Sequence, residues 1–174
     1  LEKVTGSFEK AIEEVGKILN MRGKVIPVTT EQVRLKMILS SGEVLEGEKE
    51  IYLSQDIDQG YKKISLVPNA IANSLAIDEI LNADAIIIGP GGYYTSVIAN
   101  LLVEGVAEAI RETDAVKIFV VNLMNRKGQT TGFKVSDHLR GVEKYLGEGV
   151  FDYILVNNQQ PEEELIEVYK EEGE

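Results

Sequence analysis

The first stretch of the chain carries apolar residues with the period of an α-helix. Between Thr5 and Leu19 they recur every three or four positions, which places them on one helical face. They are Phe8, Ala11, Ile12, Val15, Ile18 and Leu19. Thr5 or Ser7 is suited to cap the start of this helix, and Gly23 to supply a left-handed residue after its end. The short apolar stretch Val25 to Val28 then predicts a strand.

The period changes to two between residues 31 and 50. Apolar Val33, Leu35, Met37 and Leu39 are separated by Arg34, Lys36 and Ile38. This alternation predicts a β-hairpin with one face in water, a turn at Ser40 to Glu43 and a second strand at Val44 to Glu50. We interpret the hairpin, at about 31–50, as a solvated decoration of the main unit, with a subunit contact as the alternative. Residues 51–63 predict an extended or irregular connection.

From Ile64 onward strands and helices alternate. The predicted helices are Ala70 to Leu81, Val97 to Arg111, Ser136 to Leu146 and Pro161 to Glu172. The predicted strands, all short and rich in apolar residues, are Ala85 to Ile88, Val116 to Val121 and Phe151 to Val156. Strands separated by helices predict right-handed crossovers and a parallel sheet covered on both faces. We therefore predict an α/β fold, with residues 1–174 forming a single unit.

The composition excludes several classes of protein. Acidic residues outnumber Lys and Arg by 29 to 18, and the net charge of -11 argues against nucleic-acid binding. No apolar run approaches the roughly 18 residues that a membrane span needs. The absence of cysteine excludes disulfides, thiolate metal sites and cysteine nucleophiles, and it favours a cytoplasmic protein. An anionic small ligand stays possible, because backbone N–H groups at a helix start can hold an anion.

The ends of the three predicted strands point to the site. They run into GPGGYYTS (89–96), NLMNRKGQTTG (122–132) and NNQQ (157–160), all small, polar or rich in glycine. In open α/β sheets, ligands bind beyond the carboxyl ends of the strands, so we expect these loops to converge on one site.

The first of these loops predicts an anion or phosphate cradle. Gly89, Gly91 and Gly92 permit a close approach of the backbone, and Thr95 and Ser96 lie where the next helix begins. The loop matches neither the Walker pattern nor GxGxxG. The alternative interpretation is a tight strand-to-helix turn with a helix cap.

Further candidates come from both loops. Tyr93 or Tyr94 can stack on a base or pack against the sheet edge, and Asn100 can be a polar contact or a surface amide. Asn122 begins the second loop, where Arg126 and its neighbour Lys127 are either a phosphate clamp or solvated charges. His138, the only histidine, is more typical of a structural hydrogen-bond partner than of a catalyst. We find no catalytic motif and no metal site built from this chain alone.

Three stretches resemble one known family. GPGGYYTSVIANLLVEGVAEAI (89–110) is similar to the pattern GPGSLYTSxxPNLLVxGIxEAI, and VNLMNRKGQTTGFKVSDHL (121–139) to CNLMTQPGETxGFTxSDH. TGSFEKAIEEVGKILNMRGKVIPVT (5–29) agrees as well. The family contains the bacterial gluconeogenesis factors (YvcK-like) and the phospholactate transferases of deazaflavin coenzyme biosynthesis (CofD-like). LNMRGKVIPVT and SDHL are closer to the gluconeogenesis-factor branch. The chain departs from the pattern at Gly92, Tyr93, Ala99 and Lys127.

The resemblance implies an α/β fold built as a three-layer Rossmann-like parallel sheet with an added β-hairpin. It also implies a cytoplasmic gluconeogenesis factor that binds a nucleotide sugar such as UDP-N-acetylglucosamine. Such a factor is required for cell morphogenesis and cell-wall regulation during growth on gluconeogenic carbon sources. The implied ligand contacts centre on Tyr94 with Thr95 and Ser96. We favour a regulator without turnover and expect a homodimer.

The alternative is a phosphotransferase like 2-phospho-L-lactate transferase, with a GDP-activated donor, a deazaflavin acceptor and Mg²⁺. In this family a GGGTG-like loop lies in an amino-terminal half that has no counterpart here. The chain begins at Leu1 without an initiator methionine. We therefore expect it to be the carboxyl-terminal part of a larger Rossmann-like protein.

Overall fold

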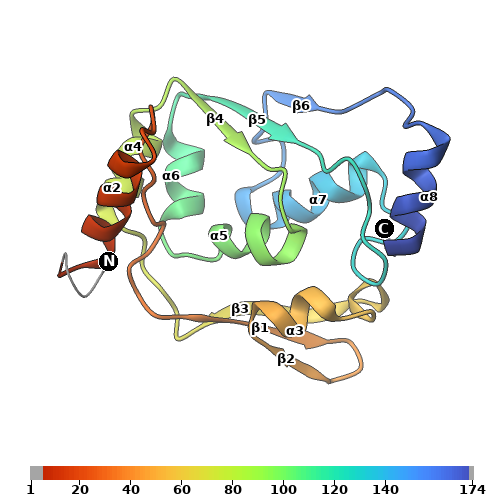
Figure 1. The fold of residues 1–174 in the computed structure, drawn as a ribbon. Coiled ribbons are helices and arrows are strands. Elements are labelled where there is room, and N and C mark those ends of the chain that lie inside the picture. The colour runs from red at the N-terminus through yellow and green to blue at the C-terminus, as the bar shows by residue number, and fades with distance from the viewer. Residues whose placement is uncertain (1–5, 173–174) are drawn as a thin grey trace.

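The structure, a computed structural model, describes residues 6–172 and stacks a helical layer between two small sheets. Figure 1 shows helices α5 (Ala99–Leu101), α6 (Val106–Glu112) and α7 (Val135–Leu146) below a parallel sheet and above an antiparallel one. Buried side chains of both sheets and of the helices form one hydrophobic core, which includes Met37 and Phe119. The predicted α/β class is confirmed.

The parallel sheet has the strand order β4–β5–β6. These strands are β4 (Ala85–Ile88), β5 (Val116–Val120) and β6 (Tyr153–Leu155), and both pairings are parallel. The predicted range of the first strand is confirmed at both ends. The helices that follow β4 and β5 carry the chain back to the start of the next strand, which brings all three carboxyl ends to one edge.

The expectation that this sheet is covered on both faces is wrong for the described chain. Ile87 in β4 is 65% exposed, and so is Tyr153 in β6. Phe119, whose side chain lies on the opposite face of β5, is 1% exposed because it packs toward the crossover helices. Apolar runs therefore marked the strands correctly, but only one of the two faces is buried here.

The hairpin belongs to a three-stranded antiparallel sheet with the order β2–β1–β3. Its strands are β1 (Arg34–Leu39), β2 (Val44–Glu46) and β3 (Tyr61–Val67). The alternation in β1 buries Leu35, Met37 and Leu39 and leaves the other face wetter, as predicted. The second strand ends at Glu46 and not at Glu50. Helix α3 (Glu48–Leu53) follows, and a 3₁₀ turn (Ile57–Gln59) precedes β3.

The remaining helices differ from the predictions mainly at their ends. α4 (Ser74–Leu81) starts four residues after the predicted Ala70, at an Asn73 cap that accepts from the Leu75 N–H. The segment predicted as one helix from Val97 to Arg111 starts earlier, as a π-helix at Tyr93–Ile98, and is broken before α6 by Gly105 at φ +97°. α7 begins after Lys134, whose N–H donates to the Asp137 carboxylate, so Ser136 is not its cap.

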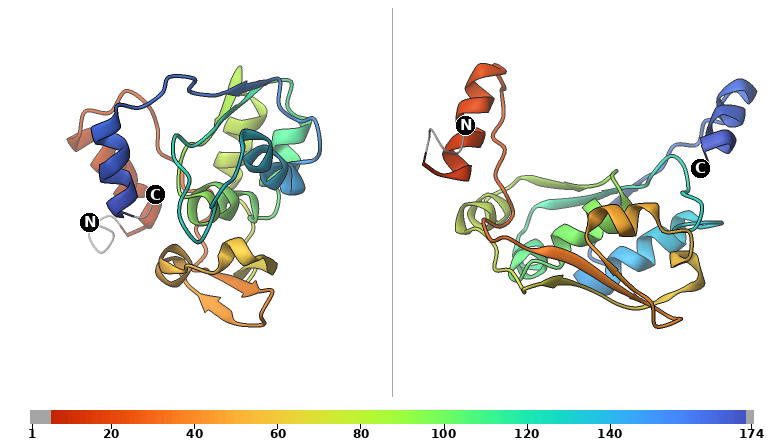
Figure 2. Two further views of the ribbon diagram at one scale, coloured as in Figure 1. Left: turned by 90° about the vertical axis from the view of Figure 1, so that its right-hand side faces the viewer. Right: turned by 60° about the horizontal axis from the view of Figure 1, so that its bottom comes forward.

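Two terminal helices project from the body. Helix α2 (Phe8–Ile18) starts at the predicted Ser7 cap, while Thr5 lies outside the described residues. The left-handed residue after it is Asn20 at φ +50° and not Gly23. The stretch Val25 to Val28, predicted to be a strand, joins no sheet within the described chain. α2 and α8 (Glu163–Glu172) project on the side of the parallel sheet away from α5, α6 and α7, as both views in Figure 2 show.

Candidate functional site

The first two predicted loops meet at a small pocket beyond the carboxyl ends of β4 and β5. Its volume is ≈ 240 Å³. The lining residues are Tyr52, Gly91, Gly92, Tyr93, Asn122, Met124, Arg126, Gln129 and Thr130. Four of the nine predicted site residues, Gly91, Gly92, Asn122 and Arg126, therefore lie around one space, which we call the loop pocket.

Glycines let the first loop pass close to its surroundings. Gly89 has φ +83°, and a Cβ there would lie 2.6 Å from the carbonyl oxygen of Val120 in β5. At Gly92 a Cβ would collide with Oγ1 of Thr95. The π-helix begins immediately afterwards, and the first N–H groups of any helix have no acceptor inside it. The loop thus combines glycine backbone, which carries no side chains, with the start of a helix, as the anion-cradle interpretation requires.

Asn122 ties the second loop to the first. Its Nδ2 donates to the carbonyl oxygen of Gly91 over 2.9 Å. The amide is half-buried, and it crosses from the end of β5 to the end of β4. This bond fixes the width of the loop pocket, because a shift of either loop would break it.

Arg126 is the cationic group of the loop pocket. Its guanidinium carbon lies 3.6 Å from the centre of the Tyr52 ring, an arrangement that combines stacking with attraction between cation and ring. The Arg126 N–H donates to Oγ1 of Thr130 over 2.8 Å, which closes the backbone of the second loop around this position. Arg126 is half-buried, whereas the neighbouring Lys127 is exposed and does not line the pocket.

Tyr52 is the contact that sequence reasoning missed. It lies in α3, within a segment predicted to be irregular. Gln129, which is 4% exposed, holds this helix by donating to the carbonyl oxygens of Ile51 and Tyr52 over 3.0 and 2.8 Å. Glu48 and Glu50 in the first turn favour a helix there, and this was the signal available in the sequence.

The two tyrosines of the first loop are buried in an aromatic cluster. Tyr94, 4% exposed, packs edge-on against Tyr61 and Tyr93, with ring centroids 5.5 and 5.0 Å apart. The Tyr93 hydroxyl donates to the carbonyl oxygen of His138 over 2.7 Å. Burial, with a smaller contribution from Tyr61, raises the pKa of both phenols. Both rings therefore stay neutral, and the Tyr94 ring does not line the loop pocket.

The other predicted residues lie around the start of the π-helix. Thr95 is half-buried beside Gly92, while Ser96 and Asn100 border an apolar groove along β4 instead of the loop pocket. Asn100 Nδ2 donates to the carbonyl oxygen of Ser96 over 2.7 Å, one turn earlier in the helix. The structure thus divides the predicted set between the two sides of the first loop.

A second hollow joins the end of β5 to the end of β6. Its volume is ≈ 180 Å³, and Asn122, Asn125, His138 and Asn157 give it polar walls. Asn125 Nδ2 donates to the carbonyl oxygen of Phe133, so its Oδ1 faces His138 Nε2 at 2.9 Å. This geometry assigns the proton to Nε2 and leaves Nδ1 as an acceptor. Burial lowers the pKa of His138, and the charge of Asp137 opposes this shift only in part.

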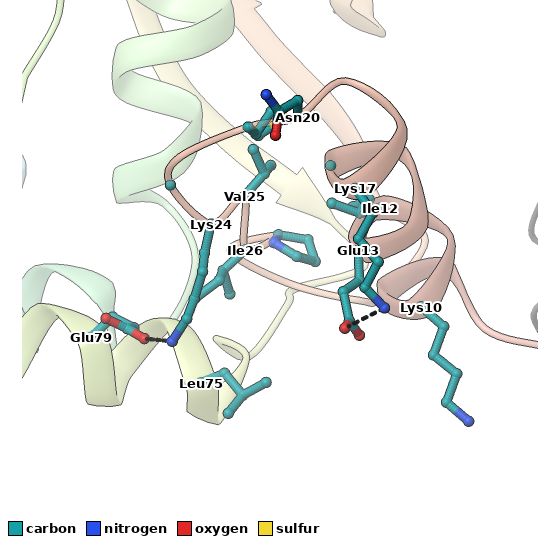
Figure 3. Close-up of a pocket in the computed structure, with 14 residues that line it drawn as sticks. Lys10, Ile12, Glu13, Lys17, Asn20, Lys24, Val25, Ile26, Leu75 and Glu79 are labelled. Atoms are coloured by element: carbon teal, nitrogen blue, oxygen red, sulfur yellow. Dashed lines mark hydrogen bonds and ion pairs between the residues drawn. The ribbon is translucent and has the colours of Figure 1, made fainter.

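A larger hollow lies away from these loops. It measures ≈ 770 Å³ and separates α2 from the segment 23–27 and α4. Figure 3 shows side chains of α2, of the segment 23–27 and of α4 around it, including the ion pair between Lys24 and Glu79 at 2.9 Å. We do not regard it as the site, because it is a gap beneath a projecting helix and holds none of the predicted residues.

Metal-ligand clusters and membrane-spanning helices were also sought among the described residues. Nowhere in 6–172 do three or more His, Asp or Glu side chains gather as metal ligands. Within the same range, no helix has the length and apolar character that crossing a membrane requires.

Comparison with known proteins places this fold and these loops in a family. The match to CofD, described as 2-phospho-L-lactate transferase CofD, extends over residues 1–174. The chain belongs to the CofD family. The resemblance found in the sequence motifs is thereby confirmed.

The relatives of this CofD-family chain carry the gluconeogenesis-factor name. A Thermotoga maritima protein, provisionally named as such a factor, is 41% identical over an alignment of 175 positions that covers 99% of this chain and 54% of that protein. The gluconeogenesis factor of Bacillus subtilis is 36% identical over 174 residues, with coverages of 99% and 54%.

A crystal structure of a UPF0052-family protein from Bacillus halodurans is also close. It is 35% identical, with a TM-score of 0.89, and the match covers 98% of this chain and 55% of that one. This chain therefore spans about half the length of the relatives that it matches.

Proposed function

We propose that the protein is a gluconeogenesis factor whose loop pocket binds the diphosphate of a nucleotide sugar such as UDP-N-acetylglucosamine. Its role is regulatory, acting on cell-wall synthesis and cell shape during growth on gluconeogenic carbon sources, in the cytoplasm and without turnover. The observation that carries the proposal is the meeting of Gly91, Gly92, Asn122 and Arg126 around one pocket in a relative of gluconeogenesis factors.

The chemistry of the loop pocket favours an anion. The chain as a whole is acidic, so an anionic ligand has to be attracted locally. Arg126 supplies a guanidinium that is already oriented by Tyr52, and the start of the π-helix adds backbone dipoles. A volume of ≈ 240 Å³ is below the roughly 300–1,000 Å³ of pockets that enclose a drug-sized ligand. The pocket therefore suits the diphosphate, with the base and the sugar outside it.

A transferase is the second candidate, because the family is described as 2-phospho-L-lactate transferase. In that function the loop pocket would hold the phosphates of a GDP-activated donor, and Mg²⁺ would balance charge on the transferred group. The described residues do not fit this ion by themselves, since no three carboxylates or histidines gather as ligands. The transferase thus depends on ligands from outside the described residues.

Calorimetric titration distinguishes these functions. The protein for this test is a chimera. It joins this chain to the part of the Bacillus subtilis gluconeogenesis factor that does not align with it, and the two parts keep the order that they have in that factor. UDP-N-acetylglucosamine is titrated first, and GDP with Mg²⁺ second. Heat from the UDP sugar without product formation supports the regulator. Binding of GDP with Mg²⁺ alone moves the assignment to the transferase.

Variants connect the ligand to the loop pocket. Arg126→Gln should weaken binding at least tenfold, which corresponds to about 1.4 kcal/mol, because a charge-assisted contact is lost. Lys127→Gln is the matched control, because it removes an adjacent positive charge that does not line the pocket. Equal losses in both variants would refute a specific role for Arg126.

A further inference from the structure

A hollow lies between α7 and the segment that leads into β3, in the space where Figure 1 shows α7 above the antiparallel sheet. Its volume is ≈ 400 Å³, which lies within the roughly 300–1,000 Å³ of small-molecule sites. The residues that α7 contributes share one face of the helix and are Asp137, Arg140, Gly141 and Lys144. We call this space the α7 hollow.

The α7 hollow is separate from the loop pocket. Among the described residues, only Tyr93 and Gln129 line both spaces, and they are 5% and 4% exposed. Both side chains are held in place, because the Tyr93 hydroxyl donates to the carbonyl oxygen of His138 and the Gln129 amide donates to the end of α3. They form a fixed wall, so the α7 hollow can take a ligand of its own.

Two side chains of opposite charge stand free at the rim of this hollow. Asp137 and Arg140 neutralise each other in an ion pair. Asp58, in the 3₁₀ turn, and Lys144, in α7, are both exposed, and neither forms an ion pair with any residue in 6–172. The Lys144 ammonium lies over the Tyr61 ring, 6.0 Å from its centre. A ligand that meets both groups has to carry one charge of each sign.

The Tyr94 hydroxyl is the buried polar group of the α7 hollow. The Tyr94 ring is 4% exposed and lines the hollow, and within the described part of the chain its hydroxyl makes no hydrogen bond. Buried polar groups in proteins nearly always have a partner. Burial is the main cause of the raised pKa of Tyr94, and Asp58 adds to it, so the carboxylate lies near this hydroxyl.

The floor of the α7 hollow is apolar. Ile57 is 1% exposed, and the rings of Tyr61, Tyr94 and Phe133 lie around it. Apolar groups gain free energy when they leave water for such a surface. The α7 hollow thus combines an apolar floor, a neutral hydroxyl and two free charges of opposite sign.

We propose that the α7 hollow binds a free α-amino acid with an apolar or aromatic side chain. The ammonium of the amino acid donates to the Asp58 carboxylate and to the Tyr94 hydroxyl oxygen. Its carboxylate accepts from Lys144, and its side chain packs on the floor. A diphosphate does not match these walls, because the charges around the hollow sum to zero.

Nuclear magnetic resonance of the ¹⁵N-labelled chain tests the proposal. The chain itself is the test protein, because every residue named for the hollow belongs to it. L-phenylalanine and L-leucine are titrated separately. The amide signals of Gly60 and Gly141, which line the α7 hollow, should shift with saturation. The signal of Gly91, in the loop pocket, should stay in place.

Two analogues of L-phenylalanine test the recognition of each charge. 3-Phenylpropionate lacks the ammonium, and 2-phenylethylamine lacks the carboxylate. Each analogue should bind about tenfold more weakly than L-phenylalanine, because one charge-assisted hydrogen bond is missing.

Variants assign each charge to its partner. Asp58→Asn should weaken L-phenylalanine about tenfold and leave 3-phenylpropionate unchanged, because that analogue has no ammonium to lose. Lys144→Gln should likewise weaken L-phenylalanine and leave 2-phenylethylamine unchanged. Lys62→Gln is the matched control, because Lys62 is exposed beside Tyr61 and does not line the hollow. The amide spectrum of each variant shows that its fold is retained.

Three outcomes would overturn the proposal. The first is that neither amino acid shifts the Gly60 and Gly141 signals with saturation. The second is equal affinity for L-phenylalanine and its two analogues. The third is an Asp58→Asn variant that is folded and weakens all three compounds alike. Each titration is done without a nucleotide sugar, so a failure here is separate from a failure of the proposed function.

Discussion

Tyr94 is held among aromatic rings and does not lie at the loop pocket. Its ring contacts Tyr61 and Tyr93 edge-on and is 4% exposed. Tyr94→Ala should therefore destabilise the fold by about 3 kcal/mol, as removal of a buried ring does. Tyr94→Phe, which keeps the ring, should stay near the parent value. Urea unfolding measures both, and a Tyr94→Ala protein that loses affinity but no stability would instead make the ring a ligand contact.

His138 makes stability depend on pH. Its folded pKa is lowered from the ordinary 6.5, mainly by burial, so folding disfavours the protonated ring. The stability from the neutral ring is complete above about pH 6.5 and is lost as the pH falls through 6.5 toward the folded pKa. We expect the urea concentration at the midpoint of unfolding to decrease as the pH is lowered from 7.5 to 5.

The control for this titration is His138→Gln, which has no ionisable group at that position and should flatten the pH dependence. Asp137, with a pKa lowered by the Lys134 N–H and by Arg140, loses its contribution only as the pH falls below the ordinary 3.8. It does not interfere in the measured range. An equal pH dependence in both proteins would assign the effect to other groups.

Among the elements, the second loop is fixed by one glycine. Gly128 has φ +76°, and a Cβ there would collide with the backbone of Gln55, which leads from α3 toward β3. Gly128→Ala should cost more than about 2 kcal/mol, since backbone strain and a clash combine. Gly132→Ala is the matched control, with φ +70° and no atom within 4 Å of the added Cβ.

Unfolding of the two glycine variants in urea separates strain from collision. The control should lose only about 1–2 kcal/mol, the cost of a left-handed non-glycine residue. If both variants lose the same stability, the contact with Gln55 is not what fixes the loop.

Elements with one dominant signal were predictable from the sequence. The run Ala85 to Ile88 is apolar and flanked by Asp84 and Gly89, and it is β4 to the residue. The helix predicted from Val97 to Arg111 was interrupted because Gly105, which the apolar stripe passes over, adopts a left-handed conformation. α3 was missed because its six residues are too few to show a helical period, with three charged residues followed by Ile51, Tyr52 and Leu53.

The loop pocket was predictable in outline for a topological reason. Carboxyl ends of parallel strands meet at one edge, so Gly91 and Asn122 had to be neighbours. Tyr52 was beyond reach, because it comes from a segment whose position depends on Gln129 binding the end of α3. The burial of Tyr94 was beyond reach too, since a ring at a loop satisfies a cluster and a ligand equally well.

For the whole molecule, the homodimer stays a prediction that the hairpin can test. β2 is a short edge strand, and Val44 on it is 43% exposed. If the hairpin forms the subunit contact, sedimentation equilibrium should show a dimer that Val44→Glu converts to a monomer. A chain that sediments as a monomer at high concentration would remove this contact.

The exposed face of the parallel sheet, opposite the buried Phe119, also has a calorimetric consequence. A folded protein of 174 residues ordinarily unfolds with a heat-capacity increase of about 2–2.6 kcal/mol/K, most of it from apolar groups that become hydrated. In this chain Ile87, Tyr153 and Leu155 are largely hydrated before unfolding begins. The increase should therefore fall below that range. The free energy of unfolding of this chain should therefore depend only weakly on temperature. Its stability should increase little on cooling and decrease little on moderate warming.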